Sequence, residues 1–252
     1  MPTIALVTGA TSGIGESFAR LILEDNKYDE LWLTGRNKIK LADLAKLDKK
    51  IVTIEADLAS SGVEIIGQKL REEKVKVGLL INSAGVGFRV PFEEQTEGEI
   101  ESTIELNILA LTKLTRACLP FMEDGNSRII NIASTAGFLP QPGFAVYAAS
   151  KSYVISFSRA LAEELRTRRI RVTAVCTGPV ATDFQRRATG GSETEFKGFR
   201  KKIVTTPLKV AEASLKANAK NRKVLVLGAS QKLFHFATKI IPHGWILKAI
   251  TW

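Results

Sequence analysis

The stretch TIALVTGATSGIG, residues 3–15, decides the fold. Its first five residues form an almost continuous apolar run, which suits a strand buried in a parallel sheet. Residues 16–23 then read as an amphipathic helix. A strand, a glycine-rich turn and a helix in this order predict a dinucleotide, because N–H groups at the helix N-terminus bind a pyrophosphate. The alternative is a flexible turn. The residues that we expect around the dinucleotide are Gly9, Thr11, Ser12, Gly13, Ile14 and Gly15.

The rest of the chain repeats this alternation. Apolar runs predict six further strands, at 31–34, 51–54, 77–81, 127–133, 171–176 and 224–227. Helical patterns lie between them, at 40–47, 63–73, 99–121, 147–166 and 207–219. The order predicts a single α/β domain, a Rossmann-like, doubly wound, seven-stranded parallel sheet. We assign residues 1–231 to the dinucleotide-binding and catalytic part, and 232–252 to a C-terminal amphipathic segment of the same domain.

Composition excludes several classes of protein. The 252 residues are 45% hydrophobic and 25% charged, as expected for a soluble globular chain. Two cysteines in apolar surroundings and two histidines argue against a disulfide framework and against a metal site. No secretion signal is visible, and no apolar run reaches the ~18–20 residues that span a bilayer. We therefore expect a cytoplasmic protein without a metal.

The net charge of +10 raises the question of a nucleic-acid partner. The basic residues are scattered along the chain and accompany no nucleic-acid-binding pattern, so we expect no such partner. A phosphorylated cofactor or an anionic substrate uses positive charge equally well.

Residues at the strand ends indicate which dinucleotide binds. Arg36 follows the second strand, where Asp or Glu would bind the ribose 2′-OH of NAD and an arginine accommodates the 2′-phosphate of NADP. A solvated loop arginine is the alternative. Asp57, followed by Leu58, could receive the adenine amino group or cap the next helix. After the fourth strand, small residues let the backbone approach a ligand. The cofactor residues expected there are Asn82, Ala84 and Gly85.

Tyr147 and Lys151 lie four positions apart in a stretch with strong helix potential. Positions i and i+4 share a helix face, so both side chains can reach one site. A neighbouring cation lowers the pKa of a phenol, and this predicts a proton donor and acceptor usable near pH 7. A surface contact is the alternative. Ser134 directly follows the fifth strand and lies at its carboxyl end, where ligands bind in such sheets. Asn107 interrupts an apolar helical run, and packing against backbone would also satisfy its amide.

With these motifs in place, the chain resembles the short-chain dehydrogenase/reductase family over most of its length. The matching segments are TGATSGIG (8–15), NSAG (82–85), Asn107, Ser134 and YAASK (147–151), with thirteen positions from Ser134 to Tyr147. The resemblance implies that Tyr147 exchanges a proton with the carbonyl oxygen, which Ser134 polarises. It also implies that Lys151 holds the nicotinamide ribose and lowers the pKa of Tyr147. Asn107 would anchor a water that links Lys151 to solvent.

The resemblance also implies that a loop after the sixth strand contacts the nicotinamide side of the cofactor. Its cofactor residues would be Gly178, Pro179, Val180 and Thr182. Tyr147 and Lys151 are expected to contact the cofactor as well. The chain departs from the family pattern in three places. Ser83 replaces a usual Asn, and Thr177 replaces a usual Pro, which makes that loop less rigid. Ser12 stands where many NADP-using members carry a basic residue, so Arg36 does most of the discrimination. NADP(H) is the favoured cofactor and NAD(H) the alternative.

These features predict an NADP(H)-dependent oxidoreductase that interconverts a carbonyl and an alcohol and reduces an apolar ketone or aldehyde. The expected substrate residues are Ser134, Phe138, Phe144, Tyr147 and Phe184, with Phe88, Leu139 and the segment 184–199 lining the pocket. The alternative is a catalytically weak protein on the same fold that senses a dinucleotide or binds a membrane surface. Sensors of that kind commonly lose the Tyr or the Lys, whereas this chain keeps both.

Two segments carry less specific signals. Residues 184–205 are polar and irregular, and an insert of that length is usually a lid or disordered. The tail from Lys232 is apolar and basic, and Pro242 and Gly244 should split its helix. Apolar stripes pack against protein more often than against lipid, so contact within the fold or between subunits is the expectation and membrane-surface contact the alternative. We also expect a homo-oligomer.

Overall fold

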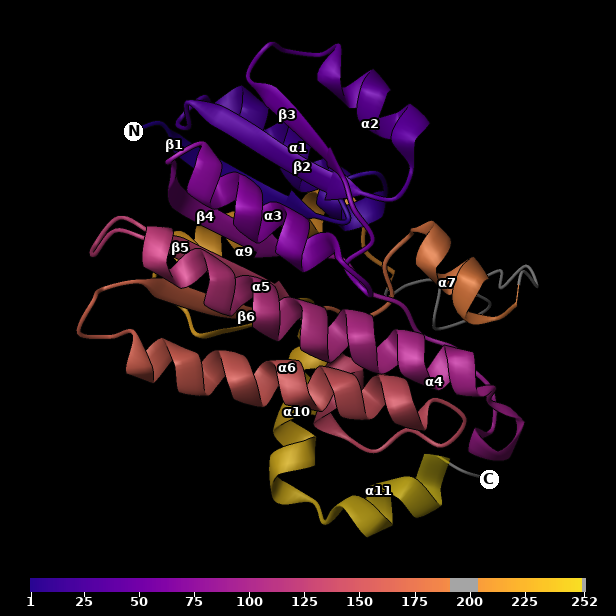
Figure 1. The fold of residues 1–252 in the computed structure, drawn as a ribbon. Coiled ribbons are helices and arrows are strands. Elements are labelled where there is room, and N and C mark those ends of the chain that lie inside the picture. Colours follow the sequence, from indigo (N-terminus) through magenta and orange to yellow (C-terminus); the bar gives the residue numbers. More distant parts are fainter. Residues whose placement is uncertain (191–203, 251–252) are drawn as a thin grey trace.

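The computed structural model describes residues 1–190 and 204–250. Seven parallel strands form one sheet in the order β3-β2-β1-β4-β5-β6-β7, which confirms the predicted architecture (Figure 1). β2 and β3 are added on one side of β1, whereas β4 to β7 are added on its other side. The strand order therefore reverses between β1 and β4, and ligands bind at such a switch point. The strands are β1 (Thr3–Thr8), β2 (Glu30–Gly35), β3 (Ile51–Glu55), β4 (Lys76–Asn82), β5 (Arg128–Ile132), β6 (Arg171–Cys176) and β7 (Val224–Val226).

Helices cover both faces of the sheet, and the alternation of side chains along β1 shows why. Ile4 and Leu6 of β1 belong to a core with one set of helices, and Ala5 and Val7 to a core with the other set. The first set, seen on one face in Figure 1, comprises α3 (Gly62–Glu72), α5 (Leu111–Cys118) and α6 (Ala145–Glu164). The second comprises α1 (Gly13–Asp25), α2 (Lys38–Ala45) and α9 (Pro207–Ala219). A strand buried on both faces has to be apolar throughout, as residues 4–7 are.

The single helix expected at 99–121 is divided. α4 (Glu97–Ile104) runs into a π-helical segment (Glu105–Ala110), which is followed by α5 and a 3₁₀ turn, η3 (Leu119–Phe121). The π segment contains Asn107, whose side chain bonds to Val86 and to Ser150 outside the helix. π-bulges occur frequently at functional sites, where they re-aim a side chain. Pro120 then ends the regular hydrogen bonding, because it has no N–H group.

The stretch 184–205, expected to be irregular, begins with a helix, α7 (Asp183–Ala188). Asp183 lies in its first turn and Arg186 and Arg187 in its last, and these charges complement the helix dipole. The chain also returns to the body where Thr205 pairs with Val180. Phe196 and Phe199 of this stretch lie outside the described residues.

The tail forms two helices, α10 (Ala229–Ile240) and α11 (His243–Ile250), separated at Pro242 as predicted. α10 starts before Lys232, so the division between residues 231 and 232 falls inside a helix. In the two described ranges, no helix has both the length and the apolar character needed to cross a membrane.

Candidate active site

The turn between β1 and α1 has the geometry of a phosphate-binding loop. Gly9 and Gly13 adopt positive φ angles of 65° and 55°, which side-chain-bearing residues rarely adopt. A Cβ at Gly15 would lie 2.2 Å from the carbonyl oxygen of Gly9, so no larger residue fits there. Ser12 precedes α1 without capping it through its side chain. The first N–H groups of a helix have no partner within the helix, so those of α1 can receive an anion.

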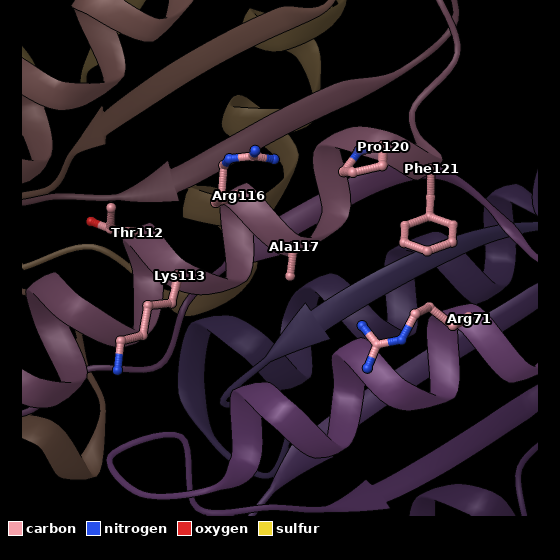
Figure 2. Close-up of a pocket in the computed structure, with 7 residues that line it drawn as sticks. All are labelled: Arg71, Thr112, Lys113, Arg116, Ala117, Pro120 and Phe121. Carbon is pink, nitrogen blue, oxygen red and sulfur yellow. The ribbon is translucent and has the colours of Figure 1, made fainter.

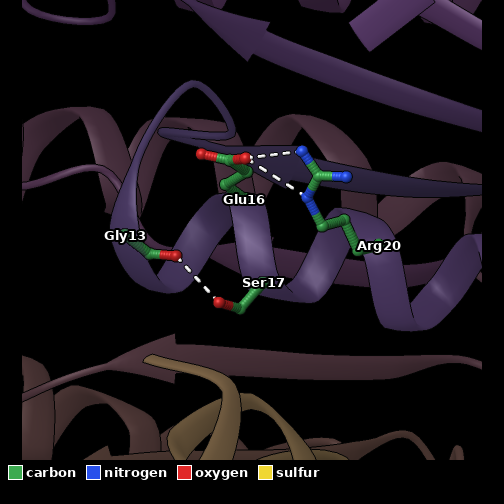
Figure 3. Close-up of polar contacts among 4 residues, drawn as sticks. All are labelled: Gly13, Glu16, Ser17 and Arg20. Carbon is green, nitrogen blue, oxygen red and sulfur yellow. Dashed lines mark hydrogen bonds and ion pairs between the residues drawn. The ribbon is translucent and has the colours of Figure 1, made fainter. Parts of the chain in front are cut away.

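A pocket of about 380 Å³ lies beside this helix end. Ser17 donates a hydrogen bond from Oγ to the carbonyl oxygen of Gly13 at 3.1 Å, and Arg20 donates from Nε and Nη2 to Oε1 of Glu16 at 3.2 and 2.8 Å (Figure 3). Thr182 approaches from the loop after β6, with Cγ2 2.9 Å from the place that a Cβ on Gly13 would take. The pocket is lined by Ser12, Gly13, Glu16, Ser17, Arg20, Lys40, Ala181, Thr182, Asp183 and Pro207.

The loop after β4 is bound directly to the end of β1. The hydroxyl oxygen of Thr8 accepts hydrogen bonds from the N–H groups of Ser83 and Ala84, both at 3.0 Å. The backbone of Ala84 lies 3.0 Å from where a Cβ on Gly9 would be. Gly9 and Ala84, predicted separately as cofactor residues, are therefore in contact.

Asn82 was predicted as a cofactor residue, but its side chain points into the interior. Its Nδ2 donates to Oγ1 of Thr115 at 3.0 Å and to Oδ1 of Asn131 at 2.8 Å, and Asn131 in turn donates to Ser158 at 2.9 Å. A buried amide must be satisfied, and here protein groups satisfy it. Only the backbone of Asn82 is left for a cofactor.

Arg36 and Asp57 come together at the ends of β2 and β3. Nη1 of Arg36 lies 3.8 Å from Oδ2 of Asp57, and the two side chains are 64% and 44% exposed. Asp57 also accepts a hydrogen bond at Oδ1 from the N–H of Ala59 at 3.0 Å. This bond lies within the turn before α3, whose N-cap residue is Ser61, so the capping role considered for Asp57 is not present. A 2′-phosphate at Arg36 would meet a cation with only a weak competing partner.

Tyr147 lies in the first turn of α6 and is almost completely buried, with 8% of its surface exposed. Phe144 stacks on its ring at a centroid distance of 4.2 Å, and Phe184 lies 5.4 Å away at a tilt of 44°. Ser134 begins the 3₁₀ turn η4 (Thr135–Phe138) after β5 and bonds to the Tyr147 side chain. Ser134, Phe144 and Phe184 thus surround the phenol, as the sequence predicted.

The direction of the Tyr147 pKa shift contradicts the sequence prediction. Burial raises the pKa to about 12, although the hydrogen bond with Ser134 and the charge of Arg89 lower it. Desolvation disfavours the phenolate, and this effect outweighs the nearby donor and cation. Lys151 is not among the groups that lower the pKa, because its Nζ lies 5.6 Å from the centre of the Tyr147 ring and donates to the carbonyl oxygen of Ile132 at 3.0 Å.

Lys151 and Asn107 meet on either side of Gly85. A Cβ on Gly85 would lie 3.0 Å from Oδ1 of Asn107 and 3.4 Å from Nζ of Lys151. Asn107 accepts from the N–H of Val86 at 3.0 Å and donates to its carbonyl oxygen at 2.8 Å and to Ser150 at 2.9 Å. Burial lowers the pKa of Lys151 to about 8, against the opposing effect of Cys176. The backbone packing considered for Asn107 is therefore present beside the lysine.

Several expected residues do not face the phenol. The Phe138 ring lies 3.9 Å from the His235 ring of α10, and Leu139 is buried in the protein interior. Leu58 and Val180, which were expected at the cofactor and not at the phenol, are buried in the two main cores. In the nicotinamide-side loop, Pro179 accepts a hydrogen bond from the N–H of Thr205 at 3.1 Å.

Comparison with known proteins identifies the family. The sequence pattern described as "short chain dehydrogenase" matches residues 3–192. The NADP-dependent 3-hydroxy acid dehydrogenase YdfG of Salmonella typhi is 34% identical over 216 residues, which cover 83% of this chain and 86% of the relative. The chain belongs to the short-chain dehydrogenase/reductase family. It is therefore an oxidoreductase of the kind that the motifs predicted.

Two solved structures of the family share the whole fold. A short-chain dehydrogenase from Sphingobium yanoikuyae in complex with NADPH superposes with a TM-score of 0.80 at 29% identity, covering 100% of this chain and 97% of that one. The bulky-bulky ketone specific alcohol dehydrogenase from Comamonas testosteroni gives 0.76 at 26% identity, covering 100% and 95%. The family fold therefore extends to the tail, beyond the matched pattern.

Sequence reasoning missed four residues of this short-chain dehydrogenase site. A Cβ on Gly87 would lie 2.4 Å from the Tyr147 ring, and one on Gly137 would lie 2.7 Å from the Lys151 backbone. Arg89 lies 4.9 Å from the Phe144 ring centre. The side chain of Gln231 lies 2.9 Å from the place of a Cβ on Gly178. The first two could have been suspected as glycines near a motif, but no local pattern points to the other two.

The groove drawn in Figure 2 lies elsewhere. It measures about 580 Å³ and runs between α3 and α5. Its lining contains no candidate residue of the short-chain dehydrogenase site: Arg71, Thr112, Lys113, Arg116, Ala117, Pro120 and Phe121. Size alone therefore does not mark the active site here. The described residues also contain no cluster of three or more His, Cys, Asp or Glu side chains that could hold a metal ion.

Proposed function

We propose that this enzyme reduces an apolar ketone or aldehyde to the alcohol with NADPH. One observation carries the proposal: Tyr147 is buried between two aromatic rings, with Ser134 bonded to its phenol and Lys151 on the same helix. A dinucleotide sensor on this fold would need none of these groups. Their arrangement supports turnover over binding alone.

The proton comes from Tyr147. With a pKa of about 12, its phenol stays protonated at neutral pH, which is the form that reduction of a carbonyl requires. Ser134 would donate a hydrogen bond to the same oxygen and polarise it. Ser134 and the charge of Arg89 would stabilise the phenolate that the proton transfer leaves behind, since both lower the pKa of Tyr147.

The turn between β1 and α1 fits the pyrophosphate of the cofactor. Gly9 and Gly13 adopt positive φ angles, and at Gly15 the carbonyl group of Gly9 leaves no room for a side chain. Arg36 would hold the 2′-phosphate, with NAD(H) as the weaker alternative. When bound, NADPH supplies the hydride. We assign Lys151 to the nicotinamide ribose. Asn107 positions that lysine through its bonds to Val86 and Ser150, where the family resemblance places a water that leads to solvent.

The aromatic walls favour an apolar substrate. Phe144 and Phe184 flank Tyr147, and the related Comamonas testosteroni enzyme is specific for bulky-bulky ketones. Arg89 supports a second candidate class, the oxo acids. Its guanidinium lies over the Phe144 ring and is close enough to lower the pKa of Tyr147, and the Salmonella typhi relative acts on 3-hydroxy acids.

A panel of carbonyl compounds tests both classes. Purified protein is incubated with NADPH and with pairs of substrates, each an apolar ketone or aldehyde and its carboxylate-bearing analogue, while NADPH oxidation is followed. Turnover of the apolar member is the expected result. Preference for the acid, lost in Arg89→Gln, would move the proposal to oxo acids. NADPH binding without turnover of any member would support a sensor.

We further propose that the enzyme works in the cytoplasm as a homo-oligomer. The free thiols of Cys118 and Cys176 support a reducing location, and size-exclusion chromatography with light scattering tests the oligomeric state.

A further inference from the structure

Helix α10 carries three of its four large apolar side chains on the side that faces away from the fold, and the fourth, Phe234, is half-buried. Leu233, Phe236 and Ile240 follow one another at helical spacing and are 70%, 61% and 64% exposed. At about 100° per residue they occupy one side of the helix. This orientation is unusual, since an amphipathic helix normally turns its apolar side toward the core.

The opposite side of α10 is already occupied. Gln231 lies against Gly178 of the nicotinamide-side loop, His235 stacks on Phe138, and Thr238 is buried. The helix is thus attached to the body through its polar side. The predicted packing of the tail within the fold accounts for this side alone.

Helix α11 extends the outward apolar surface. Trp245 is 71% exposed and Ile241, at the break before Pro242, is 42% exposed. His243 bonds through Nε2 to the carbonyl oxygen of Thr238 at 3.1 Å and so joins the two helices. Figure 1 shows α10 and α11 projecting beyond α6 at the edge of the molecule. We call Leu233, Phe236, Ile240, Ile241 and Trp245 the apolar stripe.

The charged side chains of the sequence beyond Glu212 all have one sign. After Glu212 the chain contains no acidic residue, and it contains seven basic ones: Lys216, Lys220, Arg222, Lys223, Lys232, Lys239 and Lys248. Lys232 and Lys239 lie on α10 at about 90° from the centre of the stripe, along one edge of it. Exposed apolar residues with a tryptophan, bordered by lysines, are the composition of a helix that lies in a membrane interface.

We propose that the apolar stripe binds the surface of an anionic lipid bilayer. The large side chains would enter the boundary between headgroups and acyl chains, and the lysines would remain at the level of the anionic headgroups. A bilayer there would lie about one helix diameter, ~10 Å, from Phe138 and Gly178 on the inner side of α10. This proposal does not depend on the substrate, since it concerns the outer surface of the tail.

The charge pattern distinguishes a bilayer from a second copy of the chain. A twofold interface would place the stripe against the same stripe of the partner. The lysines of the two copies would then approach each other, and residues 229–250 offer no acidic side chain to pair with them. Anionic lipid provides the opposite charge over the whole surface.

Co-sedimentation of the full-length protein with vesicles tests the proposal. Vesicles of phosphatidylcholine with one third phosphatidylglycerol are compared with vesicles of phosphatidylcholine alone, at low and at high salt. We expect the protein to sediment with the anionic vesicles at low salt and to be released by salt. Trp245 should also shift its emission to the blue on binding, measured in a Trp252→Phe background, since Trp32 is already buried.

Three variants make the test specific. Leu233→Ser, Phe236→Ser and Ile240→Ser together remove the centre of the stripe and should abolish sedimentation. Reversal of the three tail lysines (Lys232→Glu, Lys239→Glu and Lys248→Glu) should weaken binding at least about 100-fold, at roughly fivefold for each lysine near the surface. The matched control is Ile39→Ser with Phe92→Ser and Leu208→Ser, which removes equally exposed apolar residues elsewhere and should change nothing.

Activity on a water-soluble carbonyl, or NADPH binding if none is turned over, shows that the stripe variant is folded. The proposal is overturned if the protein sediments with neither kind of vesicle, or if the stripe variant still sediments with the anionic vesicles. Loss of an oligomer in the stripe variant, without vesicle binding by the unmodified protein, would instead identify the stripe as a subunit interface.

Discussion

The surroundings of Tyr147 and the Arg36 corner, which is formed by Arg36 and Asp57, lie at the carboxyl edge of the same sheet. Their side chains are held in different ways. Near Tyr147, the buried side chains of Asn107 and Lys151 are bonded to backbone carbonyl groups at 2.8–3.0 Å. At the corner, Arg36 and Asp57 are exposed and approach each other only to 3.8 Å. The proposed catalytic geometry is therefore held by buried hydrogen bonds, whereas the corner is held only by a weak, exposed ion pair. The four predictions below test this contrast, from the largest effect to the smallest.

The largest effect is expected from Tyr147→Phe. The substitution removes the phenol oxygen and keeps the ring between Phe144 and Phe184, so the fold and NADPH affinity should be preserved. General acid–base groups supply ~10²–10⁴-fold in rate, and kcat should fall by that amount. Steady-state kinetics and NADPH titration measure the two quantities. Full turnover by the folded variant would remove Tyr147 from the chemistry.

The second prediction concerns the cost of burying Lys151. Its pKa is lowered from 10.5 to about 8 in the folded protein, so between these values the unfolded chain binds more protons and stability rises with pH. Between about pH 7 and pH 10 the free energy of unfolding should gain about 2–3 kcal/mol relative to Lys151→Met. Tyr147 does not interfere, since its stabilising contribution is lost only above its unfolded pKa of 10.0.

Urea unfolding of the cofactor-free protein and of Lys151→Met at several pH values measures this difference. Lys151→Met keeps the length of the side chain and removes the charge. A constant difference between the two proteins across this range would mean that the lysine is already solvated, and the contrast with the Arg36 corner would disappear.

The third prediction moves to that corner. A hydrogen bond to a charged group contributes roughly 1.5–3 kcal/mol, which corresponds to about a 10- to 150-fold preference for NADPH over NADH. Arg36→Asp should invert or abolish the preference, and the ratio of kcat/KM values with the two cofactors measures it. Lys38→Asp is the matched control, because Lys38 is an exposed cation beside a carboxylate, Glu55, as Arg36 is beside Asp57. Equal use of both cofactors by the unmodified enzyme would leave Arg36 a solvated arginine.

The sequence predicted what depends on local pattern. Tyr147 and Lys151 share a helix face because of their spacing, and Arg36 follows β2 because apolar runs mark strands. The missed features depend on packing between distant segments. The Tyr147 pKa rises because burial outweighs Ser134 and Arg89, and helical spacing does not report the degree of burial.

The direction in which a side chain points is the other property that the sequence pattern does not determine. Asn82 was expected just after the fourth strand and is the last residue of β4, and its amide turns inward to Thr115 and Asn131. The stripe on α10 has the predicted helical period, but periodicity is the same whether the apolar side faces the core or solvent. Contacts with other segments decide between the two, as Gln231 and His235 do for α10.

The smallest effect is expected at Arg20 on α1. Its ion pair with Glu16 is exposed, and such pairs at i and i+4 contribute about 0.3–0.5 kcal/mol. Arg20→Ala should therefore lower the free energy of unfolding by no more than about 0.5 kcal/mol, and less at high salt. Glu16→Ala should cost slightly more, because a carboxylate in the first turn also interacts favourably with the helix dipole. Urea unfolding at two salt concentrations measures both variants, and NADPH titration should show no change for Arg20→Ala. Weaker NADPH binding by Arg20→Ala would instead extend the cofactor site from the phosphate-binding turn to this arginine, and a second exposed ion pair besides the Arg36 corner would act on the cofactor.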